Sequence, residues 1–400
     1  MPLSTGRHYL AIPGPSVMPD EVLQAMHRPA PNIYTGELLD LAHSLRPDLK
    51  AIARTEGHVA MYIANGHAMW EASLMNVCAR GDKVLVLATG RFGIGWGAVA
   101  TALGIEAEVM DFGNQATIDF DRLEARLRAD GAGAFKAVLV THVDTAVSIR
   151  NDIAAVSAAI KAAGHDALLM VDCIASLACE EFAMDDWGAD VMIAASQKGL
   201  MTPPGMGFIF FNDRAKAAGN TGNMRTPYWE WERRADPTQL YEFFDGTAPT
   251  HHLFGLRKAV DMILAEGLQN VTDRHATIAR AYWAAVAAWG QGGSLRMNLD
   301  DPALRSHAVS TLCIEPPMGV RLRNWLTDNA GITLGIPLNM VPEGDPREHG
   351  YFRIGHMGHI NAQMALGVIG SIDAGLKALG VDHGAGASDA AARVFADAAG

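Results

Sequence analysis

Short apolar runs alternate with helical patterns through the first two thirds of the chain, and this alternation narrows the possible folds. Strand-like runs cover residues 83–88, 107–111, 136–141, 167–172, 190–195 and 207–211. Helical patterns separate several of them, at residues 93–103, 118–128 and 153–163. Apolar strands that alternate with helices are typical of a mainly parallel sheet with both faces covered. The sequence therefore predicts a large α/β domain of this kind.

The pattern changes near residue 250 and predicts a second, smaller α+β domain. A long helical region covers residues 251–288, with a weak break near Gly267. Strand-like and helical stretches then follow at residues 310–315, 320–329, 351–355 and 362–379. We expect an N-terminal arm at 1–20, a large domain at 21–265, a small C-terminal domain at 266–382 and a flexible tail at 383–400. The tail is rich in Ala, Gly and Asp, and chain ends of this kind are often poorly ordered.

The overall composition argues against several classes of protein. The net charge is −12 and no basic stripe is visible, so a nucleic-acid partner is not expected. The cysteines at positions 78, 173, 179 and 313 lack zinc-ligand spacing and fit a reducing compartment. Residues 1–16 lack the apolar core of a signal peptide, and polar residues interrupt the longest uncharged stretch, 354–372. We therefore expect a cytoplasmic protein with no metal site and no membrane partner.

Two reactive side chains follow neighbouring strand-like runs. Asp172 ends the run 167–172, and Lys198 comes just after the run 190–195. Ligands of such sheets bind beyond the carboxyl ends of the strands. A lysine there can form a Schiff base with an aldehyde cofactor, and an aspartate can keep a pyridine nitrogen protonated. The pair points to pyridoxal 5′-phosphate, although a solvent-facing lysine and a helix-capping aspartate are ordinary alternatives.

Three segments around these residues resemble a known family. Residues 171–177, 196–198 and 203–205 are similar to the class V aminotransferases, pyridoxal phosphate enzymes of fold type I. Within that family they most resemble the serine/alanine/aspartate–glyoxylate aminotransferase group. The resemblance runs from residue 13 to about residue 379. It implies a homodimer with active sites at the interface, and small amino and oxo acids as substrates.

The resemblance implies a set of cofactor contacts. Besides Asp172 and Lys198, they are Asn65, Gly66, His67, Ala68, Phe92, Thr145, Gln197 and Thr247. Residues 65–72 are similar to the segment whose helix N-terminus binds the cofactor phosphate. Phe92 would stack on the pyridine ring, and Thr145 would bind its phenolic oxygen, although residues 146–148 depart from the family pattern. Thr247 resembles the residue that each protomer donates to its partner's phosphate. Outside the family these are ordinary helix, turn and loop residues.

The resemblance also implies how substrate is bound. Arg353 lies in a segment similar to the family's Arg-Ile-Gly motif, where a guanidinium grips the substrate α-carboxylate with two hydrogen bonds. Aspartate has a second carboxylate, and Arg91, beside Phe92, is the candidate for binding it. A structural strand arginine and a turn-capping arginine are the ordinary alternatives. The similarity around Arg353 to members with dicarboxylate donors favours aspartate over serine and alanine as donor, with glyoxylate as acceptor. The products are then glycine and the matching 2-oxo acid.

Other functions compete with this one. Glycines at 90–97 and a strand ending at Asp111 imitate a nicotinamide-dependent dehydrogenase, but the spacing is not G-x-G-x-x-G. A cysteine desulfurase would need a reactive loop thiol, whereas Cys313 falls inside a strand-like run. The pyridoxamine–pyruvate aminotransferases share a segment like 353–358, but their phosphate cup is altered, whereas residues 65–67 look intact here. A non-catalytic binding protein would not need lysine, aspartate and arginine together.

Overall fold

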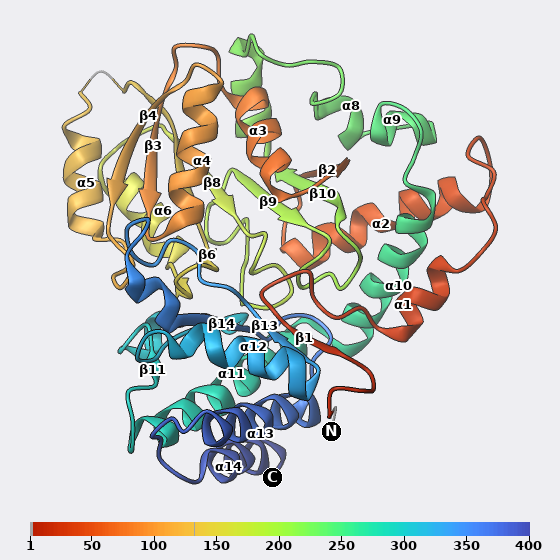
Figure 1. The fold of residues 1–400 in the computed structure, drawn as a ribbon. Coiled ribbons are helices and arrows are strands. Elements are labelled where there is room, and N and C mark those ends of the chain that lie inside the picture. The colour runs from red at the N-terminus through yellow and green to blue at the C-terminus, as the bar shows by residue number, and fades with distance from the viewer. Residues whose placement is uncertain (1–2, 132) are drawn as a thin grey trace.

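The computed structural model describes residues 3–131 and 133–400 and contains a seven-stranded sheet (Figure 1). Its strands lie in the order β2 (His58–Ala64), β10 (Gly205–Phe211), β9 (Val191–Ala195), β8 (Leu168–Asp172), β5 (Phe135–Thr141), β3 (Lys83–Ala88) and β4 (Glu106–Asp111). β10 is antiparallel to both of its neighbours, and the other pairs are parallel. The predicted mainly parallel sheet is confirmed. β2 is the strand that the sequence patterns did not indicate, because its run of Ala, Met and Tyr continues directly into a helix.

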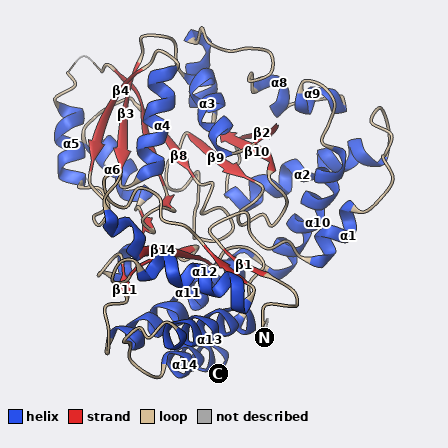
Figure 2. Ribbon diagram, viewed as in Figure 1, coloured by secondary structure: helices blue, strands red, loops and turns tan. Residues whose placement is uncertain are grey.

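Helices cover both faces of this sheet (Figure 2). Alternate side chains of a strand point to opposite faces. On β3, Val84 and Val86 pack with α3 (Gly66–Val77) and α4 (Arg91–Ala102). The intervening Leu85 and Leu87 belong to the other core. That core also contains residues of α2 (Glu37–Ala53), α5 (Phe120–Arg128), α6 (Ile153–Ala162) and α10 (Thr250–Glu266). The sheet is therefore buried on both faces, as its apolar strands require.

Short elements fill the connections of this larger part. Helix α1 (Asp20–Met26) packs against α10. Helices α7 (Asp213–Ala218), α8 (Glu232–Ala235) and α9 (Leu240–Phe244) lie between β10 and α10, together with the 3-10 turn η1 (Gly219–Thr221). The two-residue strands β6 (Val143–Asp144) and β7 (Ile149–Arg150) pair with each other after β5.

The smaller part lies below the large sheet in Figure 1 and is built around an antiparallel sheet. Strand β12 (Val309–Cys313) pairs with β11 (Arg296–Met297) on one side and with β14 (Tyr351–Gly355) on the other. Helices α11 (Leu268–Gly290) and α12 (Met318–Ala330) contact this sheet, and α13 (Ala362–Ala378) and α14 (Ala387–Ala399) pack against α11. The turns η2 (Pro302–Leu304) and η3 (Pro346–Gly350) lie in the connections of the sheet. The chain enters this part at Gly267, where φ is +87° and the helical region breaks as predicted. Strand β1 (Tyr9–Ala11) of the N-terminal arm returns to pair in parallel with β13 (Ile332–Leu334).

The C-terminal end differs from the sequence expectation. We expected a flexible tail at 383–400, but residues 387–399 form α14, which packs against α11 and α13. Its buried side chains, Ala387 and Ala391, are small, so the helix can lie close to its neighbours. The other expected domain boundaries stay predictions, and residues 1 and 2 of the expected arm lie outside the described residues. Within those residues, no helix is long and apolar enough to cross a bilayer.

Candidate active site

A cavity of about 350 Å³ lies at the carboxyl ends of β8 and β9, a size that suits a small-molecule ligand. It brings together most of the residues predicted from the sequence: Asn65, Gly66, His67, Phe92, Thr145, Asp172, Gln197, Lys198 and Arg353. Three predicted residues do not line it: Ala68, Arg91 and Thr247. The cavity wall therefore combines the β-sheet edge, the starts of α3 and α4, and strand β14 of the smaller part.

Lys198 stands in the turn after β9, half-buried in the cavity wall. Its Nζ donates a hydrogen bond to the carbonyl of Pro13, in the N-terminal arm. Ser16 of the same arm fixes the turn, because its Oγ donates to the Lys198 carbonyl at 2.7 Å and its N–H donates to the Gln197 carbonyl at 2.9 Å. Burial, with the nearby charge of Arg353, lowers the pKa of Lys198 to about 8. A larger fraction of the amine is then neutral and nucleophilic near neutral pH.

Asp172 ends β8 with a buried carboxylate. Trp70 of α3 donates its indole N–H to Oδ2 at 2.7 Å, and the N–H of Ile174 donates to Oδ1 at 2.8 Å. Burial nevertheless raises the pKa of Asp172 to about 6. A cationic partner inside the cavity would stabilise the ionised form of this carboxylate, and a pyridinium nitrogen is such a partner. The sequence analysis missed Trp70, whose only signal was its place inside the phosphate-cup segment.

The start of α3 supplies an anion-binding end to the cavity. Asn65 caps this helix, since its Oδ1 accepts from the N–H of Ala68 at 3.2 Å. A Cβ at position 66 would come 2.5 Å from Cδ1 of Ile174, so Gly66 lets the start of α3 lie close to that side chain. His67 stands edge-on to Trp70 with ring centroids 4.6 Å apart, and burial and the charges of Arg91 and Lys198 lower its pKa. Free N–H groups at a helix start suit a phosphate.

Gln197 adds a further polar group beside the lysine. Its Oε1 is buried and finds no hydrogen-bond partner among the described residues. A buried polar atom left unpaired is costly, so its position on the cavity wall suits a polar ligand. With Asp172 and the start of α3, this atom shows that the residues present fit pyridoxal phosphate. In the described part of the chain, no group of three or more His, Cys, Asp and Glu residues could hold a metal ion.

Asp144 positions one wall of the cavity, and the sequence analysis missed it as well. Its buried Oδ2 accepts from the N–H groups of Phe92 at 2.7 Å and Gly93 at 3.4 Å. The start of α4 is thereby held so that Phe92 faces the cavity near Trp70, with ring centroids 6.2 Å apart. A side chain at Gly90 would place a Cβ 2.6 Å from the Asp144 carboxylate carbon, so this approach needs glycine.

Arg353 comes from β14 and closes the cavity from the smaller part. Its Nε donates to the Ile336 carbonyl at 2.7 Å, and its Nη1 donates to the Thr145 carbonyl at 2.9 Å. Among the described residues, Nη2 makes no hydrogen bond. Burial lowers the pKa of Arg353 to about 10, and the Asp144 carboxylate opposes that shift. The guanidinium is therefore charged at neutral pH and anchored at two of its three nitrogens, with donor capacity left for a ligand carboxylate.

The segment after Thr145 has a structural reason for its unusual sequence. Ala146 and Val147 are buried in a small core with Leu299 and Met340 of the smaller part. Ser148 has φ +68° and shares a hydrogen bond of 2.6 Å with the Thr311 hydroxyl. Residues 146–148 therefore join the two parts of the molecule, and Thr145 is held at the cavity by both.

Two of the predicted residues outside the cavity wall, Arg91 and Thr247, are exposed. Arg91 opens α4, and its Nη1 donates to the Asn339 side chain at 3.4 Å in a neighbouring hollow. Its charge still lowers the pKa values of His67 and Arg353, so it lies within electrostatic reach of the cavity. Thr247 lies in the loop between α9 and α10. Ala68 contributes its N–H to the Asn65 cap instead of facing the cavity.

Comparison with known proteins identifies the family. The family model described as aminotransferase class-V matches residues 62–333, more than half of the chain. The chain belongs to the class V aminotransferases. It is 36% identical over 401 residues to a serine–glyoxylate aminotransferase of Methylorubrum extorquens, covering 98% of this chain and 96% of the relative. It is 31% identical to an L-aspartate–glyoxylate aminotransferase of Paracoccus denitrificans, covering 97% and 96%.

Solved structures agree with the fold of this class V aminotransferase. A pyridoxamine-pyruvate aminotransferase from Mesorhizobium loti has a TM-score of 0.88 at 23% identity, covering 100% of both chains. A ureidoglycine-glyoxylate aminotransferase from Bacillus subtilis has a TM-score of 0.87 at 24% identity, covering 98% of both chains. These likenesses confirm fold type I with its smaller C-terminal sheet. The protein is thus an aminotransferase, and its family implies pyridoxal phosphate.

The family membership also corrects the nicotinamide alternative. Of the glycines that imitate a dinucleotide-binding turn, Gly90 caps α4, and those at 93, 95 and 97 lie within the helix and allow close packing. A Cβ at Gly97 would come 3.1 Å from the Val86 side chain, and one at Gly93 would come 3.0 Å from the Ala88 backbone. They let α4 lie close to β3. Cys313 is buried in β12, as expected for a structural thiol.

Proposed function

We propose that this enzyme uses pyridoxal phosphate to transfer the amino group of a small L-amino acid to glyoxylate. The observation that carries the proposal is one cavity walled by Lys198, Asp172 and Arg353, which come from three different strands or their ends. An amine, a carboxylate and a guanidinium so placed match covalent attachment, ring-nitrogen contact and carboxylate binding. Relatives named for glyoxylate support the acceptor.

Each residue then has a defined task. When bound, the cofactor supplies an aldehyde that takes up the amino group and a ring that withdraws electrons from the substrate α-carbon. Lys198 would hold it covalently and, once freed, would move a proton at the substrate α-carbon as general base and acid. Asp172 would keep the ring nitrogen protonated. Arg353 would orient the substrate carboxylate. Both half-reactions use the same residues, so we expect ping-pong kinetics.

The phosphate end of the cavity would be held by several groups. The α3 start at Asn65, Gly66 and His67 would meet the phosphate with its N–H groups, and Gln197 would contact the cofactor beside the lysine. Phe92 would cover one face of the ring, and Thr145 would meet its phenolic oxygen.

For the amino donor we propose L-aspartate, with serine and alanine next. Arg91 is the candidate partner for the second carboxylate because its charge reaches both His67 and Arg353. Relatives named for serine and for aspartate both support a small polar donor. A donor screen with glyoxylate tests this. We expect the highest kcat/KM with aspartate, and an enzyme that ignores aspartate would contradict the donor assignment. Turnover of pyridoxamine with pyruvate would favour the alternative activity.

We also propose that the working unit is a homodimer, with Thr247 of each protomer facing the partner's cavity. Asn65 and His67 are exposed, so the phosphate end of the cavity is open in a single chain. Exposed apolar side chains lie beside both surfaces: Ile63 next to Asn65, and Tyr241 on α9 shortly before Thr247. Burying them in a shared interface would remove this apolar area from water.

A further inference from the structure

One turn of the smaller part is in close contact with the turn after β9 that carries Lys198. It follows β14 and contains Gly358, which has φ +76°. A Cβ on Gly358 would lie 2.9 Å from Cγ of Met201 and 3.2 Å from the carbonyl oxygen of Lys198. Arg353 stands five residues earlier on the same segment. Gly358 therefore contacts the Lys198 turn and lies only five residues from Arg353 in the chain.

Two consecutive residues of α11 hold both polar backbone groups of Gly358. The N–H of Gly358 donates to Nε2 of His275 at 2.9 Å. Nη1 of Arg274 donates to the Gly358 carbonyl at 3.1 Å and to the Ile360 carbonyl at 2.9 Å. We call Arg274 and His275 the Gly358 clamp.

His275 can play this part in only one form. Its Nδ1 lies 2.6 Å from the Val271 carbonyl, which can only accept, so Nδ1 carries the proton. Nε2 is then an acceptor for Gly358. Burial, followed by the charge of Arg274, lowers the pKa of His275 to about 3, so the ring stays neutral in the working pH range. The clamp is therefore always in its binding form near neutral pH.

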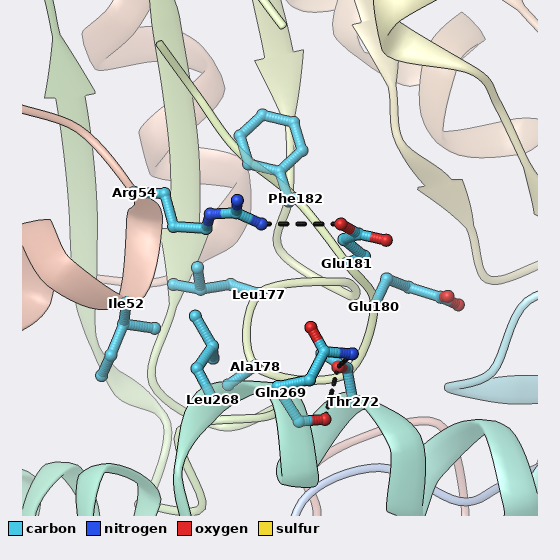
Figure 3. Close-up of a pocket in the computed structure, with 10 residues that line it drawn as sticks. All are labelled: Ile52, Arg54, Leu177, Ala178, Glu180, Glu181, Phe182, Leu268, Gln269 and Thr272. Carbon is cyan, nitrogen blue, oxygen red and sulfur yellow. Dashed lines mark hydrogen bonds and ion pairs between the residues drawn. The ribbon is translucent and has the colours of Figure 1, made fainter. Parts of the chain in front are cut away.

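Arg274 connects the clamp to the larger part. Its Nε and Nη2 donate to the carboxylate of Glu266 at 2.6 and 2.9 Å, across the helix break at Gly267. Nearby, the start of α11 meets the loop at 177–182 across a hollow of about 290 Å³ (Figure 3). Leu268, Gln269 and Thr272 face that hollow, with Arg54 and Glu181 paired at 3.6 Å on its other side.

We propose that Arg274 and His275 are positioning residues that set Arg353 at the correct distance from Lys198 for substrate carboxylates. The proposal rests on the carboxylate-binding role proposed for Arg353. Loosening the clamp would let the Gly358 turn shift, and the grip on the α-carboxylate would weaken. The amino donor and glyoxylate share that grip. Proton transfer at the bound substrate should change much less, since the side chains of Lys198 and Asp172 are held by Pro13 and by Trp70 and Ile174. Nη2 of Arg353, in contrast, makes no hydrogen bond among the described residues.

Matched variants of the holoenzyme test this through KM and kcat. Losing one buried hydrogen-bond partner should raise KM for both acids about tenfold in His275→Leu, with kcat changed less than about threefold. In His275→Gln the amide oxygen can accept from Gly358, so both KM values should return most of the way. Arg274→Met should raise both KM values. Glu266→Gln should not, because it keeps the hydrogen bonds from Arg274 to the Gly358 and Ile360 carbonyls and leaves an amide oxygen that can still accept from Arg274. The proposal would be overturned if His275→Leu and His275→Gln raised KM equally, or if Arg274→Met and Glu266→Gln did so. An unchanged KM in Arg274→Met would also overturn it.

An Arg353→Lys holoenzyme separates this proposal from the proposed function. If Arg353→Lys raises both KM values while the clamp variants do not, only the clamp is wrong. If Arg353→Lys leaves both unchanged, the carboxylate role of Arg353 fails and the clamp proposal falls with it. Should His275→Leu not fold, the Arg274→Met and Glu266→Gln pair decides alone, because both sites are at least partly exposed.

Discussion

Trp70 donates its indole N–H to the buried carboxylate of Asp172 over 2.7 Å. This contact orients Asp172 at the cavity wall, and it comes from the helix that also forms the proposed phosphate site. Behind it, Trp96 stacks against Trp70 with ring centroids 6.5 Å apart, but its own Nε1 is buried without a partner in the described chain. The two tryptophans therefore form a natural pair of test and control.

Trp70→Phe should slow turnover about tenfold or more while the cofactor stays bound, because a hydrogen bond to a charged group contributes roughly 1.5–3 kcal/mol. Without it Asp172 is free to turn from the ring nitrogen. Trp96→Phe removes an unpaired N–H and should leave kcat nearly unchanged. Steady-state kinetics of both holoenzymes measure this, and equal losses would show that Trp70 acts only through packing.

Asp172→Asn should separate activity from stability. The holoenzyme should keep its cofactor but turn over far more slowly, since removing an opposite charge lowers the pKa of the ring nitrogen by roughly 1–3 units.

Without cofactor, the same substitution should stabilise the protein at pH 7. Folding raises the pKa of Asp172 from 3.8 to about 6, so the ionised side chain costs up to roughly 3 kcal/mol there. A raised pKa favours the folded state below pH 3.8, and this advantage is lost as pH rises through 6. The gap in unfolding free energy between Asp172→Asn and the parent should therefore shrink between pH 7 and pH 4. Denaturant titrations at both values measure it, and a gap independent of pH would contradict the assignment.

Arg91→Ala should lower kcat/KM for aspartate and spare serine and alanine, because only aspartate carries a second carboxylate. A charge-assisted hydrogen bond is worth on the order of tenfold or more in binding. Asn339→Ala, which removes the present partner of Arg91, serves as the control for a structural role. A uniform loss with all three donors would make Arg91 structural.

Thr247→Ala should weaken cofactor binding, and a mixed dimer shows from which chain the residue acts. In a dimer of one Thr247→Ala and one Lys198→Ala chain, the site that keeps its lysine faces the intact Thr247 of the other chain. We expect that site to bind cofactor with parental affinity. Weak binding there would mean that Thr247 acts within its own chain, and parental affinity in the Thr247→Ala homodimer would mean that it does not contact the cofactor.

The sequence could predict those features that depend on local pattern. Asp172 and Lys198 follow apolar runs, and strand ends in a parallel sheet share one edge, so their meeting was predictable. Pro13, Trp70 and Asp144 could not be placed in this way. Each acts through a hydrogen bond to a partner far along the chain, and a single sequence does not show which distant groups meet.

The packing of the C-terminal helix α14 was also not predictable from local sequence pattern. Its Ala-rich composition looked unable to pack, yet small side chains are what lets α14 lie against α11. The clamp of Arg274 and His275 was equally invisible, since both are ordinary helix residues until Gly358 is folded against them.

The covalent link at Lys198 is the central claim, and borohydride reduction tests it most directly. The purified holoenzyme, yellow before reduction, is treated with borohydride, digested and analysed by mass spectrometry. We predict a single pyridoxyl-phosphate adduct on the peptide that contains Lys198, and no adduct in Lys198→Ala, which should also be inactive. An adduct on another lysine, or full turnover by Lys198→Ala, would contradict the account.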